Sequence, residues 1–355
     1  MARTKIVPAP LKEEIPLKKR LISVLGATAV LALGLAGCAS ASGDTADSED
    51  TGEKRVFRVA FNQTAAHPQA QAILALGEKL EEETDGQYSL ELYADGTLGS
   101  QEATIEQIQS GTIDFAFVAG SLLEGFNHDF AVVNLPYMYE SPEQQVELLN
   151  DDDIVGELYK TLEEDKIKIL AASHAGVRNV YTDKQIETPA DLAGYKIRVI
   201  GSDTNIRMME LMGGIGTPMA QDEVYTAIQS GVIDGAENNE IIYSTLAHDE
   251  IAPFYSGTRH LMMPDYFVTS PAIWDGLPTD VSDLFQSLLD DAILEALEGQ
   301  TAAIEEAKQA SKDAGAKFVE ADADAFREAV LPLHKEVVTT PLMQSVYDAI
   351  EAARG

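Results

Sequence analysis

Residues 196–239 read KIRVIGSDTNIRMMELMGGIGTPMAQDEVYTAIQSGVIDGAENN, and this stretch decides the fold class. A short apolar run at 195–200 predicts a β-strand, and apolar residues at helical spacing predict helices at 204–212 and 223–230. Short buried strands that alternate with amphipathic helices are typical of α/β proteins. The sequence therefore predicts an α/β fold.

The same alternation continues on both sides of this stretch. Ser100 precedes a helical pattern as a suitable N-cap, and Gly111 follows it as the residue that ends the helix. The tail is rich in Ala, Glu and Leu and is expected to form helices that cover the rest of the fold. The expected elements are strands at 56–61, 88–93, 115–118, 167–173 and 177–181, and helices at 69–83, 100–110, 280–315 and 322–353.

A seven-residue sequence occurs twice, as IQSGTID at 108–114 and as IQSGVID at 228–234. In each copy a helix is expected to end, with Gly111 or Gly231 in the left-handed conformation before the chain enters a strand. Because the flanking helix and strand patterns repeat as well, the sequence predicts two similar α/β lobes.

The first 37 residues have the pattern of an export signal. A KKR cluster at 18–20 is followed by an uncharged, mostly apolar run at 21–37 that ends in Leu-Ala-Gly directly before Cys38, the single cysteine. This ending resembles the lipobox of bacterial lipoproteins, so Cys38 is predicted to be the lipidated first residue of the mature protein. The alternative is a membrane-spanning anchor, which needs about 20 apolar residues and leaves the position of the cysteine unexplained.

Residues 38–54 are small, polar and acidic, without apolar periodicity, and are expected to form a flexible tether between the lipid anchor and the folded domain. The predicted location is therefore extracytoplasmic, with the protein attached to the cell membrane through its lipid.

The charge of the chain excludes several classes of partner. The formal net charge is −34, and residues 1–37 carry six basic and two acidic residues, so their removal changes it to −38. Such a surface repels nucleic acid and anionic lipid. An anionic ligand would need cationic groups concentrated at one site, which is feasible because charges are screened beyond about 8 Å at physiological salt.

The sequence contains no recognisable catalytic or metal-binding motif. The G-x-S-x-G, H-E-x-x-H and Walker patterns are absent, and a lone cysteine excludes internal disulfides and Cys-based metal clusters. We therefore expect no enzymatic activity, no cofactor and no bound metal ion.

Two arginines lie within apolar strand patterns, Arg178 in AGVRNVY at 175–181 and Arg198 in YKIRVI at 195–200. An arginine in such a strand is exposed, paired in a salt bridge or used to bind a ligand, because burying an unpaired charge is very costly. The residues alone leave these possibilities open.

The stretch 196–239 resembles the solute receptors of TRAP transporters, the DctP-type family. The resemblance rests on the strand holding Arg198, the TPM turn at 217–219, the EVY helix start at 223–225 and DGAEN at 234–238. It extends through FN at 61–62, GTID at 111–114 and LPY at 135–137, and it covers essentially the whole mature chain.

This resemblance implies a two-lobed periplasmic-binding-protein-like fold with a hinge and a long helix spanning both lobes. Lobe I would comprise residues 55–175 and 264–303, and lobe II residues 176–263 and 304–355. It also implies that a small organic acid is bound by closure of the cleft and passed to a TRAP-type membrane permease.

The resemblance further implies the residues of the binding site. Arg198 would bind the ligand carboxylate with both prongs of its guanidinium, a geometry that lysine cannot reproduce. Arg178 and Asn238 would complete the anion site, and Asn62 would contact the ligand from the opposite lobe. Glu237 would either contact ligand hydroxyls or orient the arginine.

Three departures from the sialic-acid-binding members bear on the ligand. Those members carry an acidic residue in the segment matching 118–121, where this chain has Ala119, and here Gln221 replaces an aromatic residue and Asn239 a common proline. We expect a hydroxylated organic acid such as a uronate or aldonate, with Gln221 bonding to hydroxyls, and a dicarboxylate as second choice.

Two other classes of function remain open from the sequence. One is an exported enzyme acting on sugar acids, for which Glu237 and His174 are the only candidate acid–base pair. The other is a ligand-sensing receptor that uses the same cleft to signal to a kinase at the cell surface.

Overall fold

The computed structural model describes residues 54–354. The predicted export signal, Cys38 and nearly all of the predicted tether lie outside the described residues. Within 54–354, none of the helices combines the length and the apolar character needed to span a membrane.

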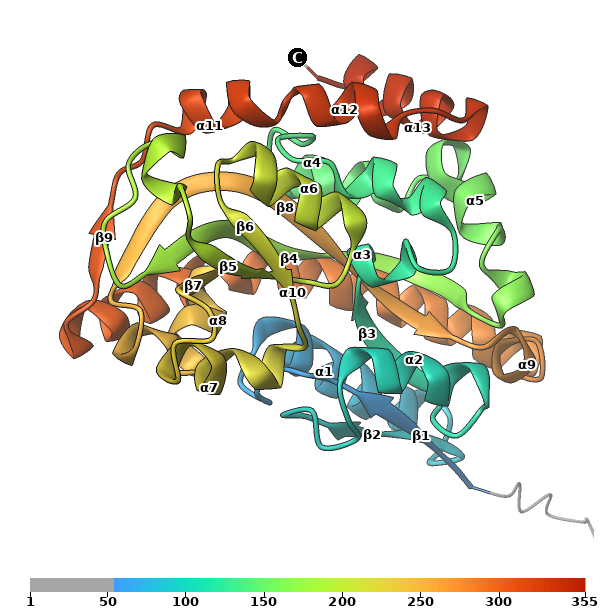
Figure 1. The fold of residues 1–355 in the computed structure, drawn as a ribbon. Helices are drawn as coiled ribbons and strands as arrows, with labels where there is room; N and C mark the ends of the chain where they lie inside the picture. The colour runs from blue at the N-terminus through green and yellow to red at the C-terminus, as the bar shows by residue number, and fades with distance from the viewer. Residues whose placement is uncertain (1–53, 355) are drawn as a thin grey trace, which may run out of the picture. The chain divides into compact units, whose positions relative to one another are not determined.

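One mixed β-sheet runs through the described residues (Figure 1). Its nine strands are β1 (Arg55–Ala60), β2 (Tyr88–Tyr93), β3 (Phe115–Ala119), β4 (Lys168–Thr182), β5 (Lys196–Val199), β6 (Ile215–Pro218), β7 (Gly235–Asn238), β8 (Phe254–Thr269) and β9 (Lys317–Val319). The strands are hydrogen-bonded in the order β2-β1-β3-β8-β4-β7-β5-β6, with β9 alongside β8. Each end of the sheet consists of parallel strands, and the long antiparallel β4 and β8 join the two ends. This arrangement confirms the predicted two-lobed α/β fold.

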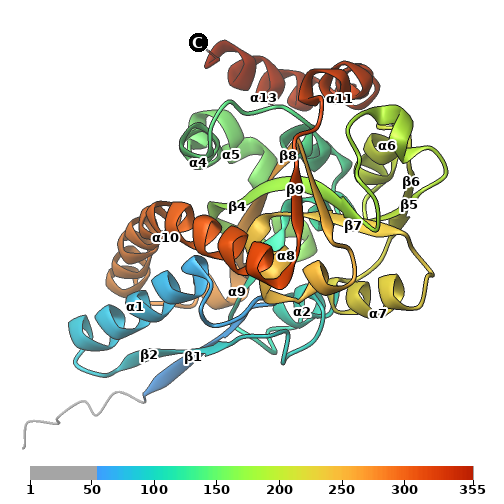
Figure 2. The ribbon, with the colours of Figure 1, turned by 90° about the vertical axis from the view of Figure 1, so that its left-hand side faces the viewer.

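Helices pack on both faces of the sheet. They are α1 (Pro68–Glu83), α2 (Gln101–Gln109), α3 (Gly120–Leu123), α4 (Pro142–Leu149), α5 (Asp152–Lys160), α6 (Asp203–Leu211), α7 (Val224–Gln229), α8 (Glu240–Thr245), α9 (Pro271–Trp274), α10 (Thr279–Ala314), α11 (Ala323–Val330), α12 (Pro332–Val337) and α13 (Pro341–Ala352). The predicted long helix is α10, whose 36 residues lie beside α1 and reach α8 and β4 (Figure 2). Helices α11 to α13 follow one another over α5 and α6 (Figure 1).

The alternation of side chains along the strands produces a separate core on each face of the sheet. Phe57, Phe115 and Phe117 point to the face that α1 and α10 cover, where the Phe115 and Phe285 rings stack with centroids 4.8 Å apart. Ala116 and Val118 point to the other face, which is covered by helices including α5, α6 and α13.

The repeated heptapeptide forms the same structure in both halves of the sheet. Gly111 and Gly231 have φ angles of 69° and 72°, in the left-handed region where glycine ends a helix without strain. Beyond them, the Asp114 carboxylate accepts a hydrogen bond of 2.9 Å from the Arg58 N–H, and Asp234 accepts one of 2.8 Å from the Lys196 N–H. The helix end with a left-handed glycine is as the sequence predicts, and the aspartate that ties each copy to the neighbouring parallel strand is a further feature that the structure adds.

The structure corrects two predicted elements. The separate strands expected at 167–173 and 177–181 are one continuous strand, β4, whose pairing with β8 is irregular between His174 and Val177. Gly176 lies in this irregularity with φ 102°. The helix expected at 322–353 is divided into three, because Pro332 and Pro341 each start a new helix.

The predicted lobe boundaries fall inside the two long strands. One boundary lies after Ala175 in β4 and the other after Met263 in β8, and His174 pairs with Pro264 across the ladder. Both boundaries therefore lie side by side at one place in the sheet, and the division into lobes stays a prediction.

Candidate functional site

Two adjoining cavities lie where the carboxyl ends of β1, β5 and β7 come together, the usual position of a ligand site in α/β proteins. The inner cavity is lined by Arg178, Asn238 and Asp265, among others. The outer cavity has a volume of about 310 Å³ and contains Arg198. Asn62 and Gln221 line both, so the two cavities form one site with an inner and an outer part.

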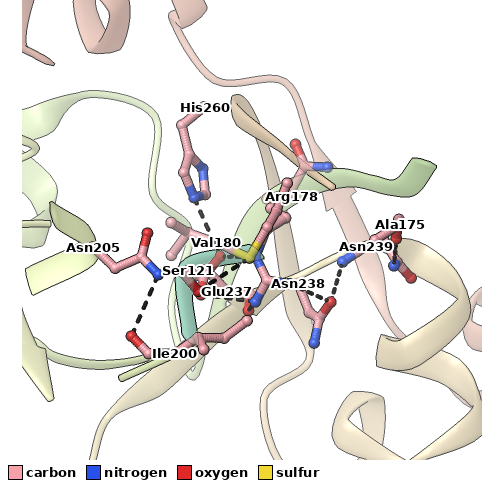
Figure 3. A network of polar contacts seen from close by, with 12 residues as sticks. Ser121, Ala175, Arg178, Val180, Ile200, Asn205, Glu237, Asn238, Asn239 and His260 are labelled. Atoms are coloured by element: carbon pink, nitrogen blue, oxygen red, sulfur yellow. Dashed lines mark hydrogen bonds and ion pairs between the residues drawn. The ribbon is translucent and has the colours of Figure 1, made fainter. Parts of the chain in front are cut away.

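Arg178 of β4 is 4% exposed, and Glu237 and Asn238 of the neighbouring strand β7 hold its guanidinium (Figure 3). Its Nε and Nη2 donate to the two carboxylate oxygens of Glu237, the Nη2 bond measuring 2.8 Å. Nη1 donates to Asn238 Oδ1 at 3.1 Å, and Nη2 also donates to the Glu237 carbonyl at 2.7 Å. The planar fork of the guanidinium is therefore fixed in one orientation.

Glu237 lies behind Arg178 and lines neither cavity. Burial alone would raise the pKa of Glu237, but the Arg178 charge and the bonds from His260 and Arg178 outweigh burial and lower the pKa to about 2. His260 Nε2 lies 3.4 Å from Glu237 Oε2, and burial lowers the pKa of this histidine (Figure 3). Of the two predicted roles for Glu237, the geometry favours orienting Arg178 over contact with a ligand.

Arg198 of β5 is 3% exposed, and its charge has no close carboxylate. Its Nε donates to the Met219 carbonyl at 3.0 Å. Within residues 54–354, no carboxylate lies within 4.0 Å of this guanidinium, and neither terminal nitrogen has a hydrogen-bond acceptor. Burial and, to a lesser degree, the charge of Arg178 lower the pKa of Arg198 to about 10, so it is still protonated at neutral pH. The terminal N–H groups are thus available to an anion in the outer cavity.

Side-chain amides connect the two ends of the sheet across the site. Gln221 Nε2 donates to Gln63 Oε1 at 3.0 Å, although Gln63 follows β1 and Gln221 follows β6. Asn62 lies next to Gln63 and lines both cavities. Amides of this kind both donate and accept hydrogen bonds, and they can therefore bind hydroxyl groups.

Comparison with known proteins identifies the family of this chain. A family model for bacterial extracellular solute-binding proteins, family 7 (DctP), matches residues 59–340. The chain belongs to the DctP family. The predicted family and the predicted class of function, a solute receptor of the TRAP type, are therefore confirmed.

Similar DctP-family proteins cover most of this chain. A solute-binding protein of Chromohalobacter salexigens is 33% identical over 301 residues, which are 81% of this chain and 87% of that protein. A TRAP periplasmic solute-binding protein from Anaerococcus prevotii, solved with bound α/β-D-glucuronate, is 34% identical with a TM-score of 0.81 and covers 84% of this chain and 98% of its own. One from Xanthobacter autotrophicus, solved with bound β-D-galacturonate, is 30% identical with a TM-score of 0.80 and covers 84% of this chain and 100% of its own.

The structure brings five of the six predicted binding residues of this DctP-family chain to the walls of the site. These five are Asn62, Arg178, Arg198, Gln221 and Asn238. The sixth, Glu237, lines neither cavity and instead binds Arg178. Each member of the candidate acid–base pair is bound to another residue. The His174 ring is hydrogen-bonded to Gln145 at 2.6 Å, with its pKa lowered to about 4 by burial, whereas Glu237 is held by Arg178.

Sequence reasoning missed Asp265, the acidic residue of the inner cavity. It is the only charged residue in the run LMMPDYFVT at 261–269, and it is 9% exposed. Burial raises the pKa of Asp265 to about 6, although a hydrogen bond from Gln69 and the charge of Arg178 both act to lower it. The argument applied to Arg178 and Arg198, a charge inside an apolar strand, would have found it.

Proposed function

We propose that this DctP-family receptor captures a hexuronate, such as D-glucuronate or D-galacturonate, and delivers it to a TRAP-type membrane permease. The observation that carries the proposal is the buried Arg198, which lines the outer cavity and has no carboxylate partner among the described residues. A buried cation without a compensating anion is energetically costly, and a ligand carboxylate is the natural counter-ion.

The rest of the site fits a ligand that carries hydroxyls. Asn62, Gln221 and Asn238 supply amide donors and acceptors along the cavity walls, and Arg178 adds a fixed cation beside Asn238. The outer cavity, at about 310 Å³, is within the range of roughly 300–1,000 Å³ that is typical of small-molecule sites. Two similar receptors that were solved with glucuronate and galacturonate, at 34% and 30% identity, support this class of ligand.

Cleft closure is the mechanism that this geometry supports. Lobe I (55–175 and 264–303) would contribute Asn62, and lobe II (176–263 and 304–355) would contribute both arginines. A ligand that bonds to both lobes binds the closed form more tightly than the open form, and this difference in affinity stabilises the closed form. The Gln63–Gln221 pair would add a protein–protein bond across the same cleft.

The same proposal places the receptor outside the cytoplasm, attached by a lipid on Cys38 after removal of residues 1–37. We do not expect chemical turnover of the ligand, because general acid–base catalysis needs a pair of groups with suitable pKa values in the cleft. The pKa of Glu237 is about 2 and its carboxylate is held by Arg178, so it is poorly suited to proton transfer at neutral pH.

Titration calorimetry with the purified, ligand-free receptor tests the proposal. We expect one equivalent of D-glucuronate or D-galacturonate to bind, and mass spectrometry of the recovered ligand to show it unchanged. A folded receptor that binds neither hexuronate would overturn the ligand assignment, and steady conversion of a bound hexuronate would overturn the receptor function.

A further inference from the structure

We propose that Asp265 selects the ligand at the inner cavity, where its carboxylate accepts hydrogen bonds from ring hydroxyls and excludes any ligand with a second carboxylate. The inference rests on the proposed function and deepens it, because it distinguishes hexuronates from dicarboxylates. It also assigns a direction to the ligand, with its carboxylate on Arg198 in the outer cavity and its hydroxyls toward Asp265.

The position of Asp265 in the sheet directs it to the site. It lies on β8 in register with Ala119 of β3 on one side and Ser173 of β4 on the other. Residues in register on neighbouring strands project their side chains to the same face. Ala119 lines the same inner cavity and carries only a methyl group, so the Asp265 carboxylate is the longer of the two side chains there.

The charge of Asp265 is not neutralised within residues 54–354. Gln69 is its hydrogen-bonding neighbour, and no arginine, lysine or histidine nitrogen lies within 4.0 Å of its carboxylate. The positive charge that acts on the pKa of Asp265 is that of Arg178. The Arg178 guanidinium already donates to both carboxylate oxygens of Glu237 and to Oδ1 of Asn238. Asp265 therefore keeps acceptor capacity that a ligand can use, since an ionised carboxylate only accepts hydrogen bonds.

This acceptor discriminates between ligands of similar size. A sugar hydroxyl that donates to an ionised carboxylate forms a charge-assisted hydrogen bond, roughly twice as strong as a neutral one. A second ligand carboxylate in the same place would meet a like charge, which is unfavourable in a buried site. Arg198 at one end and Asp265 at the other thus fit a molecule with one acidic end and one hydroxylated end.

The experiment compares wild type with Asp265→Asn by titration calorimetry at pH 7.5, using D-glucuronate, D-galacturonate and succinate. The matched control is Asp291→Asn, which removes an exposed carboxylate from α10, away from both cavities. We expect Asp265→Asn to lose at least tenfold in hexuronate affinity and to bind succinate more tightly than wild type does. The control should bind all three ligands as wild type does.

A pH series on wild type keeps the test independent of the variant's folding. Protonation of Asp265, with a pKa of about 6, removes its charge, whereas Arg198 stays protonated and Glu237 stays ionised. His67, which also lines the inner cavity, stays neutral because burial lowers its pKa to about 4. Hexuronate affinity should therefore fall by about tenfold between pH 7.5 and pH 5.

The outcomes separate the two claims. Hexuronate binding that is unchanged by Asp265→Asn and by pH, or wild type that binds succinate as tightly as a hexuronate, overturns the role of Asp265 and leaves the receptor for hexuronates standing. Folded wild type that binds neither hexuronate overturns the proposed ligand and the role of Asp265 with it.

Discussion

Replacing Glu237 with glutamine removes the charge that compensates the buried Arg178 while keeping the shape of the side chain. Both partners are almost fully buried, with side-chain exposures of 5% for Arg178 and 1% for Glu237. Breaking a buried ion pair by neutralising one partner typically costs about 3–5 kcal/mol, because the other charge is left uncompensated. We expect a loss of that size in the free energy of unfolding, measured by urea titration, together with weaker hexuronate binding because Arg178 is no longer held in place.

The pH dependence of stability provides a second readout for the same pair. The pKa of Glu237 is lowered to about 2 in the folded protein, against an ordinary value of 4.5. A carboxyl whose folded pKa is depressed contributes stability above its unfolded pKa and loses it as the pH falls through the folded pKa. Wild type should therefore lose this contribution between about pH 4.5 and pH 2, and Glu237→Gln should lack that part of the profile.

Glu336→Gln is the matched control. The Arg207–Glu336 pair also has two hydrogen bonds, of 2.9 and 3.1 Å, but both side chains are more than 40% exposed. Exposed pairs contribute little because water and salt screen them. If Glu237→Gln destabilises the protein no more than Glu336→Gln does, the buried pair does not hold the site and the role assigned to Glu237 is wrong.

Three further changes test other parts of the structure. Burial raises the pKa of Glu124 to about 7, although bonds from Thr204, Asn134 and Ser202 act to lower it, so the protonated side chain stabilises the fold below about pH 4.5 and this contribution is lost as the pH rises through 7. Relative to Glu124→Gln, wild type should lose about 3 kcal/mol of unfolding free energy between pH 4.5 and pH 8. Parallel pH profiles for the two proteins would contradict this. Gly176→Ala should destabilise the protein by about 1–3 kcal/mol in urea titration. The loss should exceed that of Gly111→Ala, because a Cβ at 176 would lie 2.7 Å from Asn239 Cβ, whereas a Cβ at 111 would meet nothing within 4 Å. Equal losses in the two variants would show that the contact with Asn239 is unimportant. Cys38→Ser should move the receptor from the membrane fraction to the medium, and unchanged fractionation on immunoblots would refute the lipid anchor.

Local patterns were sufficient to predict much of the fold. The heptapeptide at 108–114 and 228–234 predicted two helix ends followed by strands, because glycine in the left-handed conformation is a requirement of the local backbone. The α10 helix was predictable from a run that is rich in Ala, Glu and Leu and includes no internal proline.

Long-range pairing was not predictable in the same way. The sequence of β8, FYSGTRHLMMPDYFVT, has neither a clean alternation nor a uniform apolar run, because the strand passes from one end of the sheet to the other and its neighbours change along its length. The same limit applies to the site. Asp265 could have been singled out, like Arg178 and Arg198, as a charge within a strand pattern, but its place beside Ala119, 146 positions away along the chain, could not be predicted.

The most direct test of a carboxylate site on Arg198 is calorimetric titration of wild type, Arg198→Ala and Arg198→Lys with D-glucuronate and with its uncharged amide. Losing the guanidinium from a desolvated ion pair typically costs about 3–5 kcal/mol, so Arg198→Ala should bind D-glucuronate at least about 100-fold more weakly than wild type. Lysine should restore only part of the affinity because it cannot form the bidentate pair, and the amide should bind poorly to wild type but similarly to the acid in Arg198→Ala. If folded Arg198→Ala binds D-glucuronate as tightly as wild type does, the ligand carboxylate lies elsewhere and this description of the site is wrong.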